Sequence, residues 1–256
     1  MVLSPSSSAQ INRIGRWAAF FYGLVCYGIF FITFLYAAGF VSNALVPRSI
    51  DSAPALSLGY ALLINIGLLG LFGLQHSIMA RKGFKRWWTQ FVPKAVERST
   101  YVLMSSLCLI TLFYLWQPMG GTIWHIDNPV GAAILYGISA TGWLTVLGSS
   151  FIINHFDLFG LRQVWLYLRG QEYTTLQFAT PGPYQYVRHP LYVGFMLAFW
   201  ATPIMTVAHL VFALVTTAYI LVAVQFEERD LVDTFGESYA DYRRRVPMII
   251  PRLRRG

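Results

Sequence analysis

Four long stretches of the chain lack Asp, Glu, Lys and Arg and consist mainly of apolar side chains. Each is at or near the roughly 20 residues that an α-helix needs to cross the hydrocarbon core of a bilayer. The pattern therefore predicts four membrane-spanning helices within residues 17–153. The stretches are residues 17–40, 56–79, 99–116 and 130–153.

A fifth stretch, residues 191–226, has 36 residues without a charged side chain. At about 1.5 Å per residue, one continuous helix of this length would be too long for a single crossing. Pro203 lies near one third of the stretch, where it removes a backbone hydrogen bond from the helix. We therefore predict a hairpin of two shorter helices, and an all-α, polytopic membrane bundle with five or six transmembrane segments.

Composition and charge agree with this fold class. The chain is 56% hydrophobic and 12% charged, with a mean hydropathy of +0.52, which is typical of membrane proteins and unlike soluble ones. If the last stretch is a hairpin, 18 of the 19 Lys and Arg residues fall on the side of the N-terminus, and Arg48 alone falls on the other side. Positive charge marks the cytoplasmic side, so both termini are expected there. We interpret the net charge of +8 as a feature of membrane topology rather than of nucleic-acid binding.

A polar loop ends in the sequence Arg-His-Pro-Leu-Tyr-Val-Gly at residues 188–194, where the last apolar stretch begins. Ionisable groups at the edge of a bilayer are costly unless they are paired or used, so Arg188 and His189 are candidate functional residues. The preceding Thr-Pro-Gly-Pro-Tyr, residues 180–184, is typical of a tight turn. We expect this turn to fix the position of the motif.

Two adjacent glutamates follow the last apolar stretch. Glu227, Leu231 and Phe235 are spaced four apart, so on a helix they share one face, and Glu227 is expected to point inward with Glu228 rotated away from that face. An inward carboxylate near His189 is suited to accept hydrogen bonds from a ribose or to hold a cation. The equally weighted alternative is a structural ion pair between Glu227 and Arg188.

A histidine and an aspartate lie at the end of the fourth predicted helix. In an extended chain, His155 and Asp157 point the same way, and a carboxylate bonded to an imidazole makes a general base. His76, which ends the second predicted helix on the same side of the membrane, joins them as a candidate catalytic residue. The alternatives are a three-ligand metal site made by these residues, or a helix cap at Asp157 beside an interfacial histidine. We favour the catalytic interpretation without a metal.

The motif at 188–194, the glutamate pair, and the Phe235-Gly236, Tyr239, Tyr242 and Val246-Pro247 pattern resemble the isoprenylcysteine carboxyl methyltransferase superfamily. Its members are integral membrane enzymes that use S-adenosylmethionine. By this resemblance, a strand-like segment and residues from the motif line the cofactor pocket. They are Leu176, Gln177, Phe178, Ala179, Tyr184, Arg188, His189, Pro190, Leu191, Tyr192 and Glu227. Ala223 stands where the prenylcysteine enzymes carry a substrate-binding arginine, so a small neutral substrate is expected.

A closer resemblance covers nearly the whole chain. Gln-His-Ser at residues 75–77, the segment 154–164 from Asn-His-Phe-Asp onward, and the 188–194 motif are similar to those of the bacterial methanethiol S-methyltransferases. This resemblance implies methyl transfer from S-adenosylmethionine to methanethiol, which forms dimethyl sulfide, with His155 and Asp157 assisting deprotonation of the thiol. It also implies a bacterial inner membrane.

Two other functional classes carry related signals. Sterol-type reductases, which resemble this superfamily and carry a similar Arg-His-Pro-x-Tyr signal, take a nicotinamide cofactor, and nitrite-reduction-associated membrane proteins are a non-catalytic alternative. We interpret residues 1–256 as one membrane domain with an N-terminal tail (1–16), four spans (17–153), and a cofactor-binding loop, hairpin and C-terminal tail (154–256). The expected partners are a small thiol and the lipid bilayer, without nucleic acid. The sequence does not indicate an oligomeric state.

Overall fold

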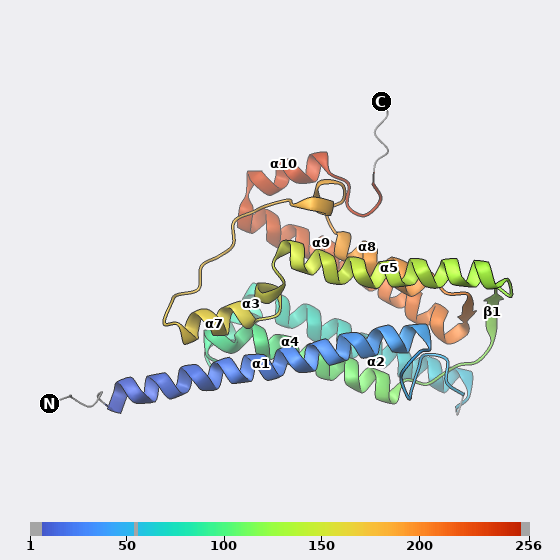
Figure 1. The fold of residues 1–256 in the computed structure, drawn as a ribbon, viewed down its shortest axis with the longest axis horizontal. Helices are drawn as coiled ribbons and strands as arrows, with labels where there is room; N and C mark the ends of the chain where they lie inside the picture. Colours follow the sequence, from blue (N-terminus) through green and yellow to red (C-terminus); the bar gives the residue numbers. More distant parts are fainter. Residues whose placement is uncertain (1–6, 54–55, 252–256) are drawn as a thin grey trace.

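The computed structural model describes residues 7–53 and 56–251, with side chains from residue 13 onward, as a bundle of long helices (Figure 1). Within the described residues, five helices are long and apolar enough to cross a membrane, which confirms the four predicted spans and the polytopic fold. The first helix starts at Ser7, inside the predicted tail 1–16, whose residues 1–6 lie outside the described part. The five are α1 (Ser7–Ser42), α2 (Leu58–Ala80), α4 (Lys94–Leu115), α5 (Pro129–Ile153) and α9 (Val207–Phe235).

The last apolar stretch forms the predicted hairpin. Helix α8 (Pro190–Trp200) has 11 residues, the chain breaks around Pro203, and α9 returns toward the starting side. At 1.5 Å per residue, α8 is about 16 Å long and so covers about half of the hydrocarbon core. The two arms are unequal, because α9 continues for 29 residues to Phe235. Both helices are shorter than the 36-residue stretch, as predicted, and α9 extends nine residues beyond its end.

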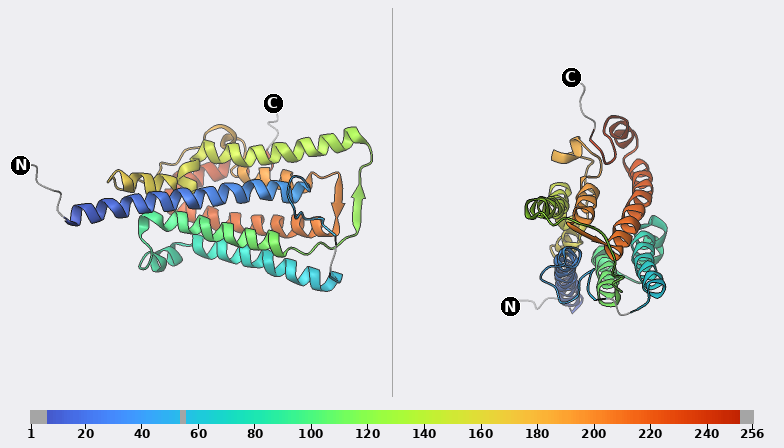
Figure 2. Two further views of the ribbon diagram at one scale, coloured as in Figure 1. Left: turned by 60° about the horizontal axis from the view of Figure 1, so that its bottom comes forward. Right: turned by 90° about the vertical axis from the view of Figure 1, so that its right-hand side faces the viewer.

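A small sheet closes the end of the bundle away from the start of α1 (Figure 2). Strand β1 (Thr122–His125) pairs antiparallel with β2 (Ile204–Thr206), which lies in the turn of the hairpin. The indole nitrogen of Trp124 donates to the carbonyl of Thr202 at 3.1 Å. Strands of three and four residues in connecting segments carry no periodic pattern, and the sequence analysis did not predict them.

Helices α5 and α8 pack closely through glycine. A Cβ atom at Gly142 would lie 2.5 Å from the backbone nitrogen of Ala198, and one at Gly194 would lie 2.7 Å from the carbonyl oxygen of Gly142. Small residues let two membrane helices approach until their backbones touch. The contact fixes α8 on α5, so the motif at the start of α8 lies beside the end of α5.

Five short helical segments lie at the other end, where α1 begins (Figures 1 and 2). Most of the basic residues also gather there, whereas Arg48 lies at the strand end and donates to the carbonyl of Tyr114. The loops that follow α2 and α5 and the segment that follows α9 therefore share one end of the bundle. The short segments are α3 (Lys82–Trp88), α6 (His155–Leu158), α7 (Leu161–Leu168), the 3-10 helix η1 (Gly182–Gln185) and α10 (Glu237–Arg245).

Candidate active site

The buried ion pair of the site joins Arg188 to Glu228. The two side chains are 10% and 6% exposed, and Arg188 Nε donates to Glu228 Oε1 at 2.6 Å. The guanidinium also donates to the carbonyls of Arg243 at 3.0 Å and Val246 at 2.5 Å. The prediction that Glu228 points away from the interior is wrong, and so is the alternative pairing of Arg188 with its neighbour Glu227. The C-terminal segment folds back after Gly236 and covers the Glu228 face of α9, which the spacing of apolar residues alone did not reveal.

The motif is also tied to the C-terminal segment by its backbone. The N–H of Arg188 donates to the carbonyl of Pro247 at 2.9 Å, and that of His189 donates to the carbonyl of Met248 at 3.2 Å. His189 Nε2 lies 3.1 Å from Glu228 Oε1. Arg188 and Glu228 thus join the 188–194 motif, α9 and the C-terminal segment to one another. The guanidinium predicted to line the cofactor pocket is directed into this scaffold.

Glu227 is the more accessible carboxylate. Its side chain is 42% exposed, Tyr192 donates to its Oε2 at 2.8 Å, and His189 Nδ1 lies 4.0 Å from the same oxygen. Glu227, Ala223 and Tyr219 are spaced four apart on α9 and therefore share one helix face. Pro190, the first residue of α8, is buried. The carboxylate is thus placed near the motif at 188–194, at the end of this helix face where the short helical segments gather.

The same face of α9 reaches a cluster of polar groups inside the membrane. Tyr219 and Ser77 share a hydrogen bond of 3.1 Å between their hydroxyls. His76, which precedes Ser77 on α2, lies 2.9 Å from the hydroxyl of Tyr101 and 3.2 Å from that of Ser105, both on α4. The ring of Phe72 packs near both His76 and Tyr219, with ring centroids 5.3 Å from that of His76 and 6.2 Å from that of Tyr219.

Sequence reasoning found His76 but not the hydroxyl groups around it. The signal was present, because Tyr101 and Ser105 are polar residues four apart within an apolar stretch. Four apart means one helix face, which is the arrangement that two hydroxyls need to contact one histidine. The sequence does not show that these hydroxyls face His76, because α2, α4 and α9 are distant segments that meet only in the folded bundle.

His155 lies in a different cluster. It is 2% exposed, its Nε2 is 2.8 Å from the hydroxyl of Tyr27, and its Nδ1 is 2.8 Å from the hydroxyl of Ser150. The ring of Phe151 is stacked on it with centroids 4.0 Å apart. Burial lowers the pKa of His155, so the ring is neutral near pH 7. Both ring nitrogens are engaged with hydroxyls of the chain itself.

The predicted pairing of His155 with Asp157 is wrong. The segment is not extended but forms the short helix α6, whose first turn is capped by the side chain of Asn154 bonded to the N–H of Asp157 at 3.1 Å. The carboxylate of Asp157 instead accepts from Arg162 at 3.0 Å and from Tyr173 at 3.3 Å. A helical turn separates side chains two apart, which an extended chain would have aligned.

The alternative of a metal held by His76, His155 and Asp157 also does not fit. The first belongs to the α2–α4 cluster, the second contacts α1 and α5, and the third is bonded to α7. Within the described ranges, no three His, Cys, Asp or Glu side chains are placed to hold one ion.

The segment 176–179 is not a strand, contrary to the expected strand-like form. Leu176 and Phe178 are half-buried, whereas Gln177 and Ala179 are exposed. The ring of Phe178 packs against aromatic rings of α9 and α10, with centroids 5.4 Å from Phe235 and 5.4 Å from Tyr242. The segment is thereby attached to the scaffold around Glu228.

Tyr184 lies where η1 meets α5 and α10. Its hydroxyl donates to the carbonyl of Ser149 at 3.4 Å, and its own carbonyl accepts from Tyr242 at 2.5 Å. Burial raises the pKa of Tyr184, and it raises that of Tyr242 to about 12, so both phenols are neutral donors. Leu191 is half-buried in the first turn of α8. These residues place the turn at 180–184 beside the motif, as the sequence predicts.

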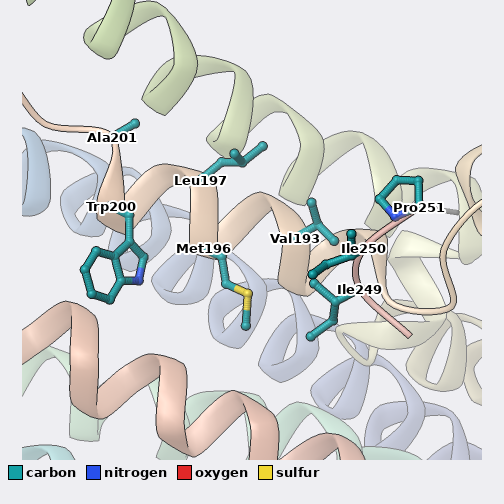
Figure 3. A pocket seen from close by; sticks show the side chains of 8 residues that line it. All are labelled: Val193, Met196, Leu197, Trp200, Ala201, Ile249, Ile250 and Pro251. Carbon is teal, nitrogen blue, oxygen red and sulfur yellow. The ribbon is translucent and has the colours of Figure 1, made fainter. Parts of the chain in front are cut away.

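An apolar groove of about 510 Å³ lies on another face of α8 (Figure 3). Its lining has no ionisable side chain, which makes it unsuited to a charged ligand. We therefore place the candidate site at Glu227 and the His76 cluster rather than in this groove. The lining residues are Val193, Met196, Leu197, Trp200, Ala201, Ile249, Ile250 and Pro251.

Comparison with known proteins identifies the family. The phospholipid methyltransferase family profile matches residues 134–238. The methanethiol S-methyltransferase of Crocosphaera subtropica is 61% identical, over 93% of this chain and 93% of the relative. Methanethiol S-methyltransferase 2 of Bradyrhizobium diazoefficiens is 54% identical, over 93% of this chain and 92% of the relative.

The methanethiol S-methyltransferase of Mycobacterium tuberculosis is 52% identical, over 92% of this chain and 97% of the relative. No solved structure matches the chain. The resemblance inferred from the residues is confirmed. Because these relatives match at 52% identity or more along almost their whole length, the chain belongs to the methanethiol S-methyltransferase family of multi-pass membrane enzymes.

Proposed function

We propose that the protein transfers a methyl group from S-adenosylmethionine to methanethiol and so forms dimethyl sulfide. The relatives supply the acceptor and the reaction class. The observation that carries the proposal is the α9 face on which Glu227, Ala223 and Tyr219 follow one another. This face joins an accessible carboxylate at the membrane edge to a histidine and hydroxyl cluster deeper in the bundle.

The residues around Glu227 fit the donor chemically. S-adenosylmethionine has ribose hydroxyls and an ammonium group, which are donors for a carboxylate, and a planar adenine that suits aromatic surfaces. Glu227 offers a half-exposed carboxylate with the hydroxyl of Tyr192 bonded to it, and Tyr184 and Phe178 offer further rings, both in contact with Tyr242. These residues, with His189 and the segment 176–179, would hold the donor. When bound, the donor supplies an electrophilic methyl group on a positively charged sulfur.

We assign His76 as the group that removes the acceptor proton. An alkyl thiol has a pKa of about 8.5 or higher, so near neutral pH most of it is protonated and unreactive. In the proposed step the S–H proton passes to the His76 imidazole as the thiol sulfur forms its new bond to the methyl carbon. The bond between that carbon and the donor sulfur breaks at the same time. The hydroxyls of Tyr101 and Ser105 orient the ring for this role.

We assign His155 to the scaffold instead. Both of its nitrogens are bonded to hydroxyls of the chain, and it is stacked on Phe151. His76 has hydroxyl partners as well, but the ring of Phe72 packs near both His76 and Tyr219, and Ser77, which follows His76 in the chain, shares a hydrogen bond with Tyr219. We assign His76 rather than His155 as the base because His76 lies near the α9 face that carries Glu227.

Positioning is the larger part of the proposed catalysis. Holding two reactants at attack distance lowers a barrier by about 7–11 kcal/mol, whereas a general base contributes a factor of about 10²–10⁴. The acceptor is small and apolar, so we infer that it reaches the site from the lipid, while the polar donor enters from the side where the basic residues gather. We propose that this side is the cytoplasm, with the protein in the bacterial inner membrane and both termini inside.

The proposal is tested with purified protein in lipid vesicles and a donor whose methyl group carries three deuterium atoms. We expect dimethyl sulfide with one labelled and one unlabelled methyl group, released in a 1:1 ratio to demethylated donor. A nicotinamide cofactor, titrated against the intrinsic tryptophan fluorescence as a control, should give no saturable change. Saturable binding of the nicotinamide together with no labelled sulfide would overturn the proposal in favour of a reductase.

A further inference from the structure

Asp157 is bonded to a loop that crosses the cytoplasmic end of the bundle. This loop, residues 171–181 and here named the donor loop, runs from α7 toward α10 (Figure 1). The hydroxyl of Tyr173 donates to Asp157 Oδ2 at 3.3 Å, while Arg162 donates to Asp157 Oδ1 at 3.0 Å. One carboxylate oxygen of Asp157 therefore accepts a hydrogen bond from the donor loop, and the other accepts one from α7, the helix that precedes the loop.

Arg162 extends this connection to the backbone of the loop. One guanidinium nitrogen donates to the carbonyl of Thr174 at 2.8 Å, and the other donates to its hydroxyl at 2.7 Å. The Arg162 Cζ atom also lies 5.2 Å from the ring centroid of Tyr173. The planar, forked guanidinium is suited to such bidentate contacts, and a lysine could not reproduce them. Asp157 orients the fork, and the fork holds two successive residues of the loop.

The loop has a second attachment and a glycine near each end. Phe178 packs on Tyr242, whose hydroxyl bonds to the turn at Tyr184, so this end is fixed to the scaffold beside the motif. Gly170 (φ +71°) precedes the loop and Gly182 (φ +55°) follows it. Positive φ is a conformation that glycine adopts without strain, so these residues set the direction of the chain where the loop leaves α7 and enters η1.

We propose that Asp157 and Arg162 are positioning residues that hold the donor loop over the donor site. The inference rests on the proposed function, because it takes the segment 176–179 as part of the donor pocket. Asp157 then acts through Arg162 and Tyr173 on donor affinity, and takes no part in proton transfer. The side chains of Asp157 and Arg162 are 13% and 22% exposed, so the hydrogen bond between them is partly sheltered from water, whereas the contacts with Tyr173 and Thr174 lie at the surface.

The experiment compares Asp157→Asn, Tyr173→Phe and Arg162→Lys with the full-length parent protein in detergent. Binding of S-adenosylhomocysteine is measured by isothermal titration calorimetry, and turnover is followed as a function of donor concentration and pH. For Asp157→Asn and Arg162→Lys we expect Kd and the donor KM to rise about tenfold, as for the loss of one charge-assisted hydrogen bond. We expect Tyr173→Phe to raise Kd about threefold, since a neutral hydrogen bond is weaker. The kcat at saturating donor and its pH profile should stay as in the parent.

Asp233→Asn is the matched control, because Asp233 is an exposed aspartate on α9 outside the site and the loop. Its Kd should equal that of the parent. The inference is overturned if Asp157→Asn leaves Kd unchanged and lowers kcat with a shifted pH profile, which would make Asp157 catalytic. It is also overturned if the variants lose thermal stability while Kd and KM stay constant. Failure of the proposed function is distinguishable, because the parent itself would then bind no donor product.

Discussion

Exchanging Glu228 for glutamine tests the assignment of the two adjacent glutamates. The substitution keeps the shape of the side chain and removes its charge from the 2.6 Å contact with Arg188. Removing one partner of a buried ion pair costs about 3–5 kcal/mol. Arg188 keeps the carbonyls of Arg243 and Val246 as acceptors, so we expect a loss of about 3 kcal/mol, the lower end of that range. In a chain of this size, 1 kcal/mol corresponds to about 2–4 °C, so Tm should fall by about 6–12 °C.

Glu227→Gln is the matched comparison, since it makes the same chemical change at the neighbouring position. Glu227 is 42% exposed, so the Tm of this variant should fall by about 2–4 °C, as for the loss of one ordinary hydrogen bond of about 1 kcal/mol. Its Kd for the donor should rise about tenfold. Thermal unfolding in detergent and a fluorescence titration with the donor give the two readouts. An equal loss of stability in both variants, or a stable Glu228→Gln protein, would refute the division into a scaffold carboxylate and a binding carboxylate.

Two further predictions concern the histidines. His76→Asn should lower kcat near pH 7 by at least about 100-fold, and a pH–rate series should show activity recovering toward pH 9.5, because thiolate then forms without a base; activity that is low at every pH would contradict this role. Burial holds the pKa of His155 below its ordinary value of 6.5, so below pH 6.5 the unfolded chain binds a proton that the folded chain does not. Stability should therefore fall as the pH drops from 7.5 to 5.5, and Tm measurements on His155→Asn should show a smaller slope; an unchanged slope would show that the ring does not contribute.

The membrane architecture was predictable because lipid leaves few alternatives. A backbone in hydrocarbon must satisfy its hydrogen bonds within the segment, so an uncharged stretch of about 20 residues is sufficient to predict a helix. Pro203 likewise marked the hairpin by its own chemistry. The motif at 188–194 was recognisable because its residues are contiguous. These features depend on local sequence, and the structure contains them.

The features that the sequence did not reveal depend on contacts between distant segments. Helix α10 and the backbone hydrogen bond between Arg188 and Pro247 decide which of Glu227 and Glu228 faces inward. Pro247 lies more than 50 residues after Arg188 in the sequence. The hydroxyl partners of His76 come from another helix. The separation of His155 from Asp157 results from one helical turn that is capped by Asn154. An asparagine at this position is compatible with a cap, but the sequence alone does not show that the next four residues are helical.

We propose that the α9 face between Glu227 and Tyr219 lines the space where methyl transfer takes place. Ala223 lies on this face one turn from each of them, and Ala218 is exposed on the same helix. The decisive measurement is the rate of labelled dimethyl sulfide formation by Ala223→Phe and by Ala218→Phe. We predict a loss of at least about 100-fold for Ala223→Phe, because the ring displaces the reactants from attack distance, and a parental rate for Ala218→Phe. A folded Ala223→Phe protein with the parental rate would contradict the account.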